Sequence, residues 1–154
     1  MASTFVLKRF EELSLDELYA IMRLRQEVFI VEQDCPYLDA DGKDQASLHL
    51  MLLQDDNLAA YVRLLPEGIS YDDYVSIGRV VSAIKYRRAG YGRRIMQEAL
   101  KVAKAQWSPL PIKISAQVYL LNFYTALGFK AVGTSYMEDD IPHIAMIYSA
   151  TITN

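Results

Sequence analysis

The fold of this chain is decided by the stretch Arg87-Arg88-Ala89-Gly90-Tyr91-Gly92. The apolar run Ser76–Ser82 precedes it and predicts a strand, whereas residues 93–106 follow it and predict a helix. A strand, a glycine-bearing loop and a helix together present free backbone N–H groups to a phosphate. The stretch therefore predicts a site for an anionic, phosphate-bearing cofactor at the start of this helix.

The residues around the loop support this prediction. One apolar stripe at helical spacing is formed by Ile95, Met96, Ala99, Leu100, Val102 and Ala103. Positive charge surrounds the helix N-terminus and is carried by Arg87, Arg88, Arg93 and Arg94. Cations at the positive end of a helix dipole are unfavourable unless an anion binds there. The alternative interpretation is a tight turn followed by a solvated basic face.

Two common nucleotide-binding fingerprints are excluded. A P-loop needs Lys and then Ser or Thr directly after its second glycine, and Arg93 and Arg94 stand there instead. A Rossmann fingerprint needs a third glycine or alanine where Ile95 stands, and an acidic residue about 20 positions further on that this chain lacks. The loop is therefore expected to bind a different phosphate-bearing ligand.

The composition indicates one globular domain over residues 1–154, with 52% hydrophobic and 23% charged residues. The net charge of −3 argues against a nucleic-acid-binding protein, and no apolar run is long enough to span a membrane, so we expect neither nucleic acid nor membrane as a partner. The two histidines are too few and too scattered to predict a metal site. A single cysteine, Cys35, and an N-terminus without a signal-peptide pattern lead us to expect a cytoplasmic protein.

The periodicity along the chain predicts strands and helices in alternation. We expect a strand over residues 4–10, then a helix that starts at the capping box of Ser14 and Glu17 and ends near residue 28. Its buried side is expected to carry Leu18, Tyr19, Met22 and Phe29. A loop is expected over residues 32–45. Further strands are expected over 48–53, 58–64, 112–116, 130–134 and 144–148, and a short helix over 120–127.

Two motifs together resemble the GCN5-related N-acetyltransferase (GNAT) family. The pattern Arg-x-x-Gly-x-Gly after a strand, here residues 87–92, is similar to the loop with which that family binds the pyrophosphate of acetyl-CoA. The stretch Asn122-Phe123-Tyr124, followed by Gly128-Phe129, is similar to a second signature of the family. The resemblance implies an α/β fold with a mixed, mostly antiparallel central sheet, helices on both of its faces, and splayed strands at the CoA site.

Further stretches resemble the ElaA-like branch of this family and extend over nearly the whole chain. They are residues 29–37, 39–44, 49–50, 78–81, 116–117 and 136–143. One departure is Asp140, because the branch pattern leads us to expect glycine at that position. The turn there is therefore expected to have a different shape.

The resemblance implies where acetyl-CoA binds as the cosubstrate. The pantetheine arm and the thioester carbonyl are expected at the end of the strand, on the backbone of Val80, Val81 and Ser82. The pyrophosphate is expected on the loop, at Arg87, Arg88, Ala89, Gly90, Tyr91, Gly92 and Arg93. Asn122 and Tyr124 complete the expected cofactor site, with Tyr124 near the sulfur atom.

Three residues are predicted to be catalytic. Tyr124 is the predicted acid, because a phenol with a pKa near 10 can give a proton to a thiolate whose thiol has a pKa of about 8.5. The alternative interpretation of Tyr124 is a core aromatic residue on a short helix. Glu32 and His143 are the predicted bases for the acceptor amine, with His49 and Glu138 as further candidates. The alternatives are a surface carboxylate for Glu32 and a hydrogen-bonded structural residue ahead of a strand for His143.

The acidic runs 39–44 and 138–140 either attract a cationic acceptor or form ordinary solvated loops. The sequence as a whole predicts an N-acetyltransferase in which an amine attacks acetyl-CoA directly. We expect the acceptor to be a small-molecule amine or a peptide N-terminus, and a homodimer is left open. The alternative function is a CoA-binding sensor or interaction module without catalysis.

Overall fold

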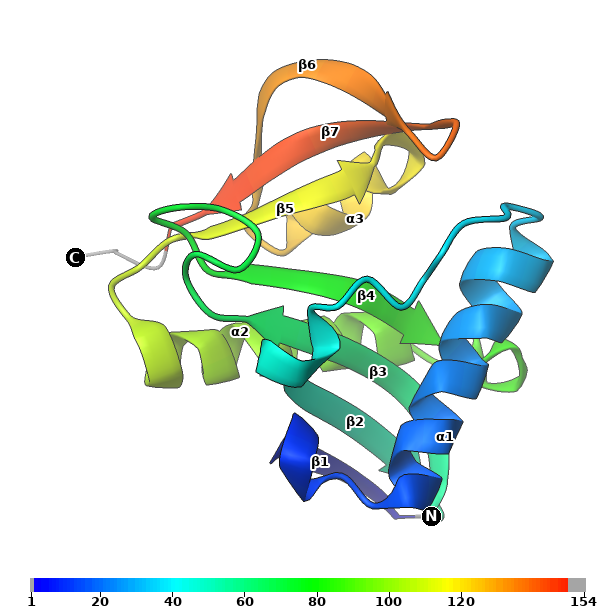
Figure 1. Ribbon diagram of the computed structural model, residues 1–154. Helices are drawn as coiled ribbons and strands as arrows, with labels where there is room; N and C mark the ends of the chain where they lie inside the picture. Colours follow the sequence, from blue (N-terminus) through cyan, green and yellow to red (C-terminus); the bar gives the residue numbers. More distant parts are fainter. Residues whose placement is uncertain (1, 150–154) are drawn as a thin grey trace.

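The computed structural model describes residues 2–149, which form two antiparallel sheets (Figure 1). The first sheet has the order β1-β2-β3-β4 and consists of β1 (Ser3–Arg9), β2 (Leu48–Gln54), β3 (Asn57–Leu65) and β4 (Ser76–Ser82). The second has the order β5-β7-β6 and consists of β5 (Ile112–Gln117), β6 (Lys130–Glu138) and β7 (Ile141–Tyr148). The two sheets meet where β4 and β5 begin.

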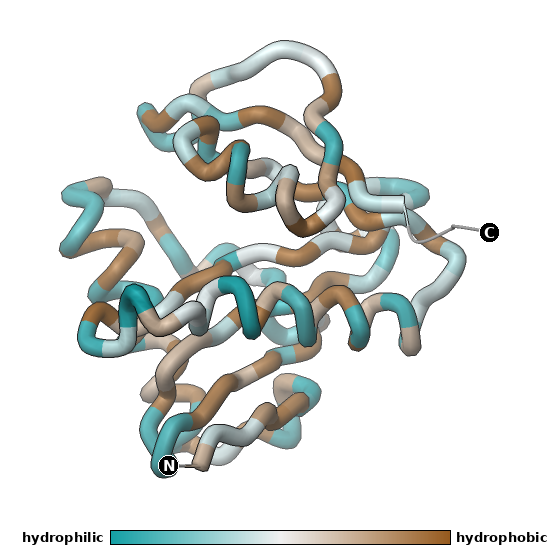
Figure 2. Tube along the Cα trace, turned by 180° about the vertical axis from the view of Figure 1, so that it is seen from behind, coloured by the Kyte–Doolittle hydropathy of each residue, from teal (hydrophilic) through white to brown (hydrophobic). Residues whose placement is uncertain are grey.

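Helices cover both faces of the first sheet. α1 (Leu15–Arg25) continues into the π-helical segment η2 (Gln26–Glu32) on one face, and α2 (Tyr91–Trp107) crosses the other face (Figures 1 and 2). α3 (Leu121–Ala126) packs on the second sheet. Short 3-10 turns complete the chain at η1 (Phe10–Glu12), η3 (Asp44–Ala46), η4 (Ile84–Tyr86) and η5 (Val118–Leu120).

The alternation of side chains along β2 and β3 explains why both faces need a helix. Leu50 and Leu52 pack towards α2, whereas Met51 between them packs towards α1. Strand residues point alternately to opposite faces, so an uninterrupted apolar strand must be buried on both sides. α2 supplies one cover with Ile95 and its neighbours at helical spacing, and α1 supplies the other with Ile21, Leu24 and Val28.

The first sheet and the second sheet separate progressively after their junction. Val75 forms a parallel bridge with Ile112, and the Ser76 hydroxyl donates to the Lys113 carbonyl at 2.7 Å. Beyond this point β4 changes register against β3, and Arg79 takes a left-handed φ of 51°. A bulge of this kind bends a strand and increases its twist. β4 therefore diverges from β5, which confirms the splayed strands and the mostly antiparallel α/β fold expected from the sequence.

Several predicted boundaries are wrong by a few residues. α2 starts at Tyr91 and not at 93, because Gly90 with a φ of 78° is its N-cap. The helical segment after α1 extends to Glu32, where the sequence predicted a loop. Tyr19 is 71% exposed and not buried, because Ile21 faces the sheet and a residue two positions away lies on the opposite side of a helix.

The last hairpin is longer than predicted. β6 extends to Glu138 and β7 begins at Ile141, so His143 lies within a strand and not ahead of one. Asp139 and Asp140 form the turn with φ values of 50° and 62°. A two-residue turn with both φ values positive favours glycine, and aspartate tolerates it better than most residues, which explains both the expected glycine and its replacement at Asp140. No helix within residues 2–149 is long and apolar enough to cross a membrane.

Candidate active site

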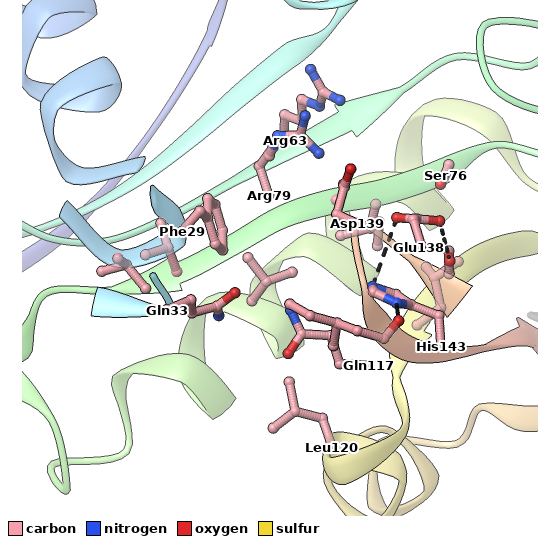
Figure 3. A pocket seen from close by; sticks show the side chains of 18 of the residues that line it. Phe29, Gln33, Arg63, Ser76, Arg79, Gln117, Leu120, Glu138, Asp139 and His143 are labelled. Carbon is pink, nitrogen blue, oxygen red and sulfur yellow. Dashed lines mark hydrogen bonds and ion pairs between the residues drawn. The ribbon is translucent and has the colours of Figure 1, made fainter. Parts of the chain in front are cut away.

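A cavity with a volume of about 650 Å³ lies between the diverging strands β4 and β5. The residues around it come from both sheets, from η2 and from the segment that follows η2 (Figure 3). Six residues that the sequence predicted as site residues line it: Val80, Val81, Ser82, Arg87, Tyr124 and His143. The sequence motifs therefore converge on one space although they lie on β4, the loop after it, α3 and β7.

The final part of β4 offers an open backbone edge to this cavity. β4 is the last strand of its sheet and pairs with β3 through Tyr61–Val81 and Ala60–Ser82. Its other edge, from Val80 onward, faces the cavity because β5 has already diverged. Free N–H and C=O groups on a strand edge can pair with an extended amide-bearing ligand. This geometry suits the pantetheine arm and the oxyanion donation expected at these residues.

Tyr124 reaches the cavity from the opposite side on α3. Its ring packs edge-on against Phe123 and Phe129, with centroids 5.1 Å and 5.8 Å away. Burial, with a smaller contribution from Tyr119, raises the pKa of Tyr124 to about 12. The phenol therefore keeps its proton at neutral pH and is a hydrogen-bond donor to any atom that binds beside it.

The loop from Arg87 to Gly92 and the start of α2 form the other end of the site. Arg88, Ala89 and Gly90 are exposed, and the left-handed φ values of Arg88 (68°) and Gly90 (78°) turn the chain into the helix. The Gly92 Cα lies close to α3, since a Cβ built there would lie 4.0 Å from the Phe123 ring. Asn122 is exposed on the first turn of α3, and Arg93 is exposed on that of α2.

Two neighbouring side chains at this helix start are already engaged. The Tyr91 hydroxyl donates to Gln54 Oε1 at 2.7 Å, so its role in the structure is to fix the helix to β2. Arg94 donates to the Ser3 hydroxyl at 2.8 Å and lies over the rings of Phe5 and Tyr91. The prediction that four arginines surround the anion site is therefore wrong for Arg94, which turns towards β1.

Arg87 forms a two-pronged ion pair with Glu32 at the end of η2, with Nη2 to Oε1 at 2.7 Å. The hydrogen bonds from Arg87 hold the pKa of Glu32 below its ordinary value. A lowered pKa makes the carboxylate a weaker base, and Glu32 lies outside the cavity lining. Arg87 and Glu32, both predicted as site residues, are therefore paired with each other in this structure.

His143 lies on β7 with its ring in the cavity wall (Figure 3). Its Nδ1 atom is 2.7 Å from the Ile141 carbonyl oxygen, which can only accept, so Nδ1 carries the hydrogen. The lone pair is then on Nε2, which is 3.7 Å from Glu138 Oε2. The Ser115 hydroxyl donates to the other oxygen, Oε1, of Glu138 at 3.1 Å and also contacts the Tyr136 hydroxyl. A nitrogen lone pair with a carboxylate beside it thus belongs to the cavity wall.

His49 is engaged away from this cavity. It is 1% exposed, and its ring nitrogens lie 2.6 Å from the Tyr61 hydroxyl and 2.8 Å from the Asp44 carbonyl. Burial lowers the pKa of His49, which favours the neutral ring in this position. The contacts of His49 therefore support a structural role for this histidine.

Two carboxylates of the acidic run 39–44 are buried, so the interpretation as an ordinary solvated loop is wrong for Asp39 and Asp44, whereas residues 40–42 are exposed. Asp39 and Asp44 are 6% and 7% exposed. Three aspartates and three arginines form one ion-pair cluster, hereafter the Arg–Asp cluster, whose members are Arg25, Asp39, Asp41, Asp44, Arg63 and Arg79. Within residues 2–149, no group of His, Cys, Asp and Glu side chains is arranged to hold a metal ion.

Some residues that line the cavity were not predicted from the sequence. On β5 the buried residues Ile112, Ile114 and Ala116 alternate with partly exposed ones, among which Ser115 and Gln117 face the cavity. A strand with one apolar and one polar face was visible in the sequence and could have identified them. Lys43, in the loop after η2, also lines the cavity. No sequence pattern indicated this, because the position of Lys43 depends on the tertiary fold.

Comparisons with known proteins agree with this geometry. Residues 17–150 match the model of the acetyltransferase (GNAT) domain. Protein ElaA of Escherichia coli is 40% identical over 137 residues, which are 88% of this chain and 89% of ElaA. The crystal structure of that protein has a TM-score of 0.88 at 37% identity and covers 95% of this chain and 99% of its own.

Two further solved structures are similar. An acyl-CoA N-acyltransferase from Pseudomonas aeruginosa is 43% identical, with a TM-score of 0.90 and coverage of 96% of this chain and 100% of that one. An aminoglycoside 6'-N-acetyltransferase complexed with coenzyme A shares the fold at 14% identity, with a TM-score of 0.72 over 97% of this chain and 99% of that one. The chain therefore belongs to the GNAT family of acyl-CoA-dependent acyltransferases, in its ElaA-like branch.

Proposed function

We propose that this protein is an N-acetyltransferase in which an amine attacks acetyl-CoA directly. The observation that carries the proposal is the convergence of three features on one cavity: the open β4 edge, Tyr124 and His143. The acetyl group is the acyl group that the motif resemblance favours. The acceptor is proposed to be a small-molecule amine or a peptide N-terminus, and a homodimer stays a prediction.

The proposed binding mode follows the direction of β4 towards α2. The pantetheine arm pairs with the backbone of Val80 to Ser82, and the pyrophosphate lies on the loop at residues 87–93 and the N-terminus of α2. Three features support this mode: the unpaired strand edge, the exposed left-handed loop residues and the seventeen-residue helix that follows. Backbone N–H groups at a helix start attract phosphate without further chemistry.

The proposed reaction uses one base and one hydrogen-bond donor. His143 Nε2 takes the proton of the amine, and Glu138 stabilises the imidazolium that results. The amine nitrogen forms a bond to the thioester carbon, backbone N–H groups of β4 stabilise the oxyanion, and the C–S bond then breaks. Full proton transfer from a phenol with a pKa of about 12 to a thiolate is uphill by roughly 5 kcal/mol. Tyr124 therefore acts by hydrogen-bonding the sulfur as its negative charge develops.

Release of the free thiol of CoA in the presence of an amine panel tests the proposal. We expect His143→Gln to lower kcat by about 10² to 10⁴ while acetyl-CoA still raises the melting temperature, because the base acts on the acceptor and not on the cofactor. Tyr124→Phe should lower kcat and leave the cofactor affinity nearly intact. Full turnover in His143→Gln would overturn the assignment of the base. Binding of acetyl-CoA without thiol release from any amine would favour the alternative, a CoA-binding sensor.

A further inference from the structure

The basic side chains in the cavity wall differ in whether a carboxylate already pairs with them. The guanidinium groups of Arg63, Arg79 and Arg87 each contact a carboxylate, at 2.6 Å, 2.7 Å and 2.7 Å. The Lys43 ammonium instead contacts the Ser70 hydroxyl at 3.0 Å and forms no ion pair with any carboxylate in residues 2–149. Lys43 therefore contributes a positive charge to the cavity wall that forms no ion pair with a carboxylate in residues 2–149.

The main chain holds Lys43 firmly in this position. Its backbone N–H donates to Asp41 Oδ1 at 3.1 Å, and its carbonyl accepts from the Ser47 hydroxyl at 2.8 Å. Asp41 belongs to the Arg–Asp cluster, in which three carboxylates already balance three guanidinium groups. The cluster therefore fixes the lysine in the wall without neutralising its charge.

Negative charge lines another part of the same cavity, at the β6–β7 hairpin. Glu138 and Asp139 point into the cavity (Figure 3), and neither pairs with a lysine or arginine in the described part of the chain. Glu138 has the Ser115 hydroxyl and His143 as its partners. An ammonium group that enters here meets a carboxylate and the proposed base together.

The loop that carries Ser70 brings the two charged ends into one compartment. Its next residue, Tyr71, also lines the cavity, and its pKa is raised by burial and by the nearby Tyr136 and Glu138. Lys43 and Ser70 line the same cavity as Glu138 and His143. The positive and the negative end therefore belong to the wall of one cavity of about 650 Å³.

We propose that the acceptor is a small zwitterion, an amine that also carries a carboxylate, with its ammonium at Glu138 and His143 and its carboxylate at Lys43 and Ser70. The inference rests on the proposed acetyl transfer and specifies its acceptor class. Hydrogen bonds to charged groups contribute enough to change an equilibrium by roughly tenfold to a hundredfold, so the carboxylate should raise kcat/KM by about that factor.

Matched acceptors of equal chain length test the inference. The probes are 4-aminobutanoate, n-butylamine and 1,4-diaminobutane, whose far ends are anionic, neutral and cationic, with glycine and 6-aminohexanoate to vary the spacing. We expect at least one amino acid to exceed its uncharged counterpart at least tenfold in kcat/KM. Lys43→Met should lower kcat/KM for the amino acid to about the value for n-butylamine, and Lys43→Glu should shift the preference towards the diamine. Lys101→Met, at an exposed lysine of α2, is the control and should change nothing.

Equal kcat/KM values for the acids and the uncharged amines would overturn the inference, as would an equal loss for both in Lys43→Met. If no amine releases thiol, the proposed acetyl transfer fails, and calorimetric titration of the same acids into the CoA-loaded protein then decides the ligand class alone. Binding that depends on Lys43 supports the zwitterion, and its absence overturns it.

Discussion

Arginine–carboxylate pairs occur on two sides of the cavity and have similar lengths but different surroundings. In the Arg–Asp cluster, Arg25 Nε lies 2.8 Å from Asp39 Oδ2, and the two side chains are 0% and 5% exposed. In the pair at the start of the loop 87–92, Arg87 Nη2 lies 2.7 Å from Glu32 Oε1, and the side chains are 34% and 38% exposed. The comparison teaches that contact distance alone does not say whether a pair is structural or exchangeable.

The Arg–Asp cluster joins four parts of the chain. Arg25 ends α1, the aspartates lie on the segment after η2, Arg63 lies on β3, and Arg79 is the left-handed bulge residue of β4. The segment after η2 crosses the first sheet in front of β3 and β4 (Figure 1). Because the groups are removed from water, each charge depends on its partners. The cluster therefore fixes the bulge that opens the cavity.

The Arg87–Glu32 pair lies at the surface, where water and salt weaken it. Glu32 presents two oxygens to the guanidinium in the way that a phosphate does. In the proposed binding mode, the pyrophosphate of acetyl-CoA replaces this carboxylate. This pair suits a site that must exchange one anion for another, and the buried cluster does not.

Breaking the buried cluster should have the largest effect. Asp44→Asn removes the carboxylate shared by Arg25 at 2.8 Å and Arg63 at 2.9 Å, and leaves three guanidinium groups with two carboxylates. We expect the free energy of unfolding to fall by about 3–5 kcal/mol, measured by denaturant titration. Glu32→Gln is the matched control in the exposed pair and should lose less than about 1 kcal/mol. Equal losses in the two variants would contradict the comparison.

Acid should act on the same cluster with the next largest effect. Burial tends to raise the pKa of Asp44, but hydrogen bonds and charges from Arg25 and Arg63 outweigh it, so the pKa lies below its ordinary value. Since the folded-state pKa is lowered, the stabilisation is complete above the unfolded pKa of about 3.9 and is lost as pH falls through the lower folded-state pKa.

Because burial lowers the pKa of His49 below its unfolded value of about 6.5, the free energy of unfolding should begin to fall below about pH 6.5. It should fall further below about pH 4 as the cluster carboxylates take up protons, by up to about 1.4 kcal/mol per pH unit for each proton. Denaturant titrations at a series of pH values measure this slope. Asp44→Asn should give a shallower acid slope than the unmodified chain, because one titrating carboxyl is absent. A slope that is unchanged in the variant would mean that other groups control acid unfolding.

The two regions also differ in how far the sequence could predict them. The loop 87–92 is local, because a strand, two glycines and an amphipathic helix are contiguous, and the order of elements around it is confirmed. The cluster is non-local, since Arg25 and Asp44 are 19 residues apart and Arg79 and Asp39 are 40 apart. No periodicity connects such residues, so the aspartates were considered as an acceptor attractant or a solvated loop.

His143 shows a second reason for the incomplete prediction. The strand signal at Ile144 was clear, but Pro142 and a two-residue aspartate turn hid the fact that β7 begins at Ile141. Because β7 begins at Ile141, the alternation of side chains along this strand places His143 on the same side as Glu138 and Ser115. His143 was predicted as a candidate because a histidine can act as a base. Its partners could not be predicted, because they depend on the pairing of β7 with β5 and β6.

The smallest expected effect concerns the exposed pair. Glu32→Gln frees Arg87 from its carboxylate, and because exposed pairs contribute about 0.2–1 kcal/mol, the affinity for acetyl-CoA should rise by up to about fivefold. Arg87→Gln should weaken binding and reduce its dependence on salt, since one cation no longer meets the phosphates. Isothermal titration calorimetry at low and high salt measures both changes. Arg23→Gln, which removes an exposed ion pair between Arg23 of α1 and Glu27 of η2, serves as the control.

Turnover of the same Glu32→Gln variant separates the two roles that have been considered for this carboxylate. As a placeholder for phosphate, Glu32 can be replaced with kcat nearly unchanged, because it neither lines the cavity nor faces the acceptor. As a general base, its loss should lower kcat by about 10² to 10⁴. Weaker acetyl-CoA binding in this variant would contradict the exchange of one anion for another, and with it the distinction between the fixed and the exchangeable arginine pairs.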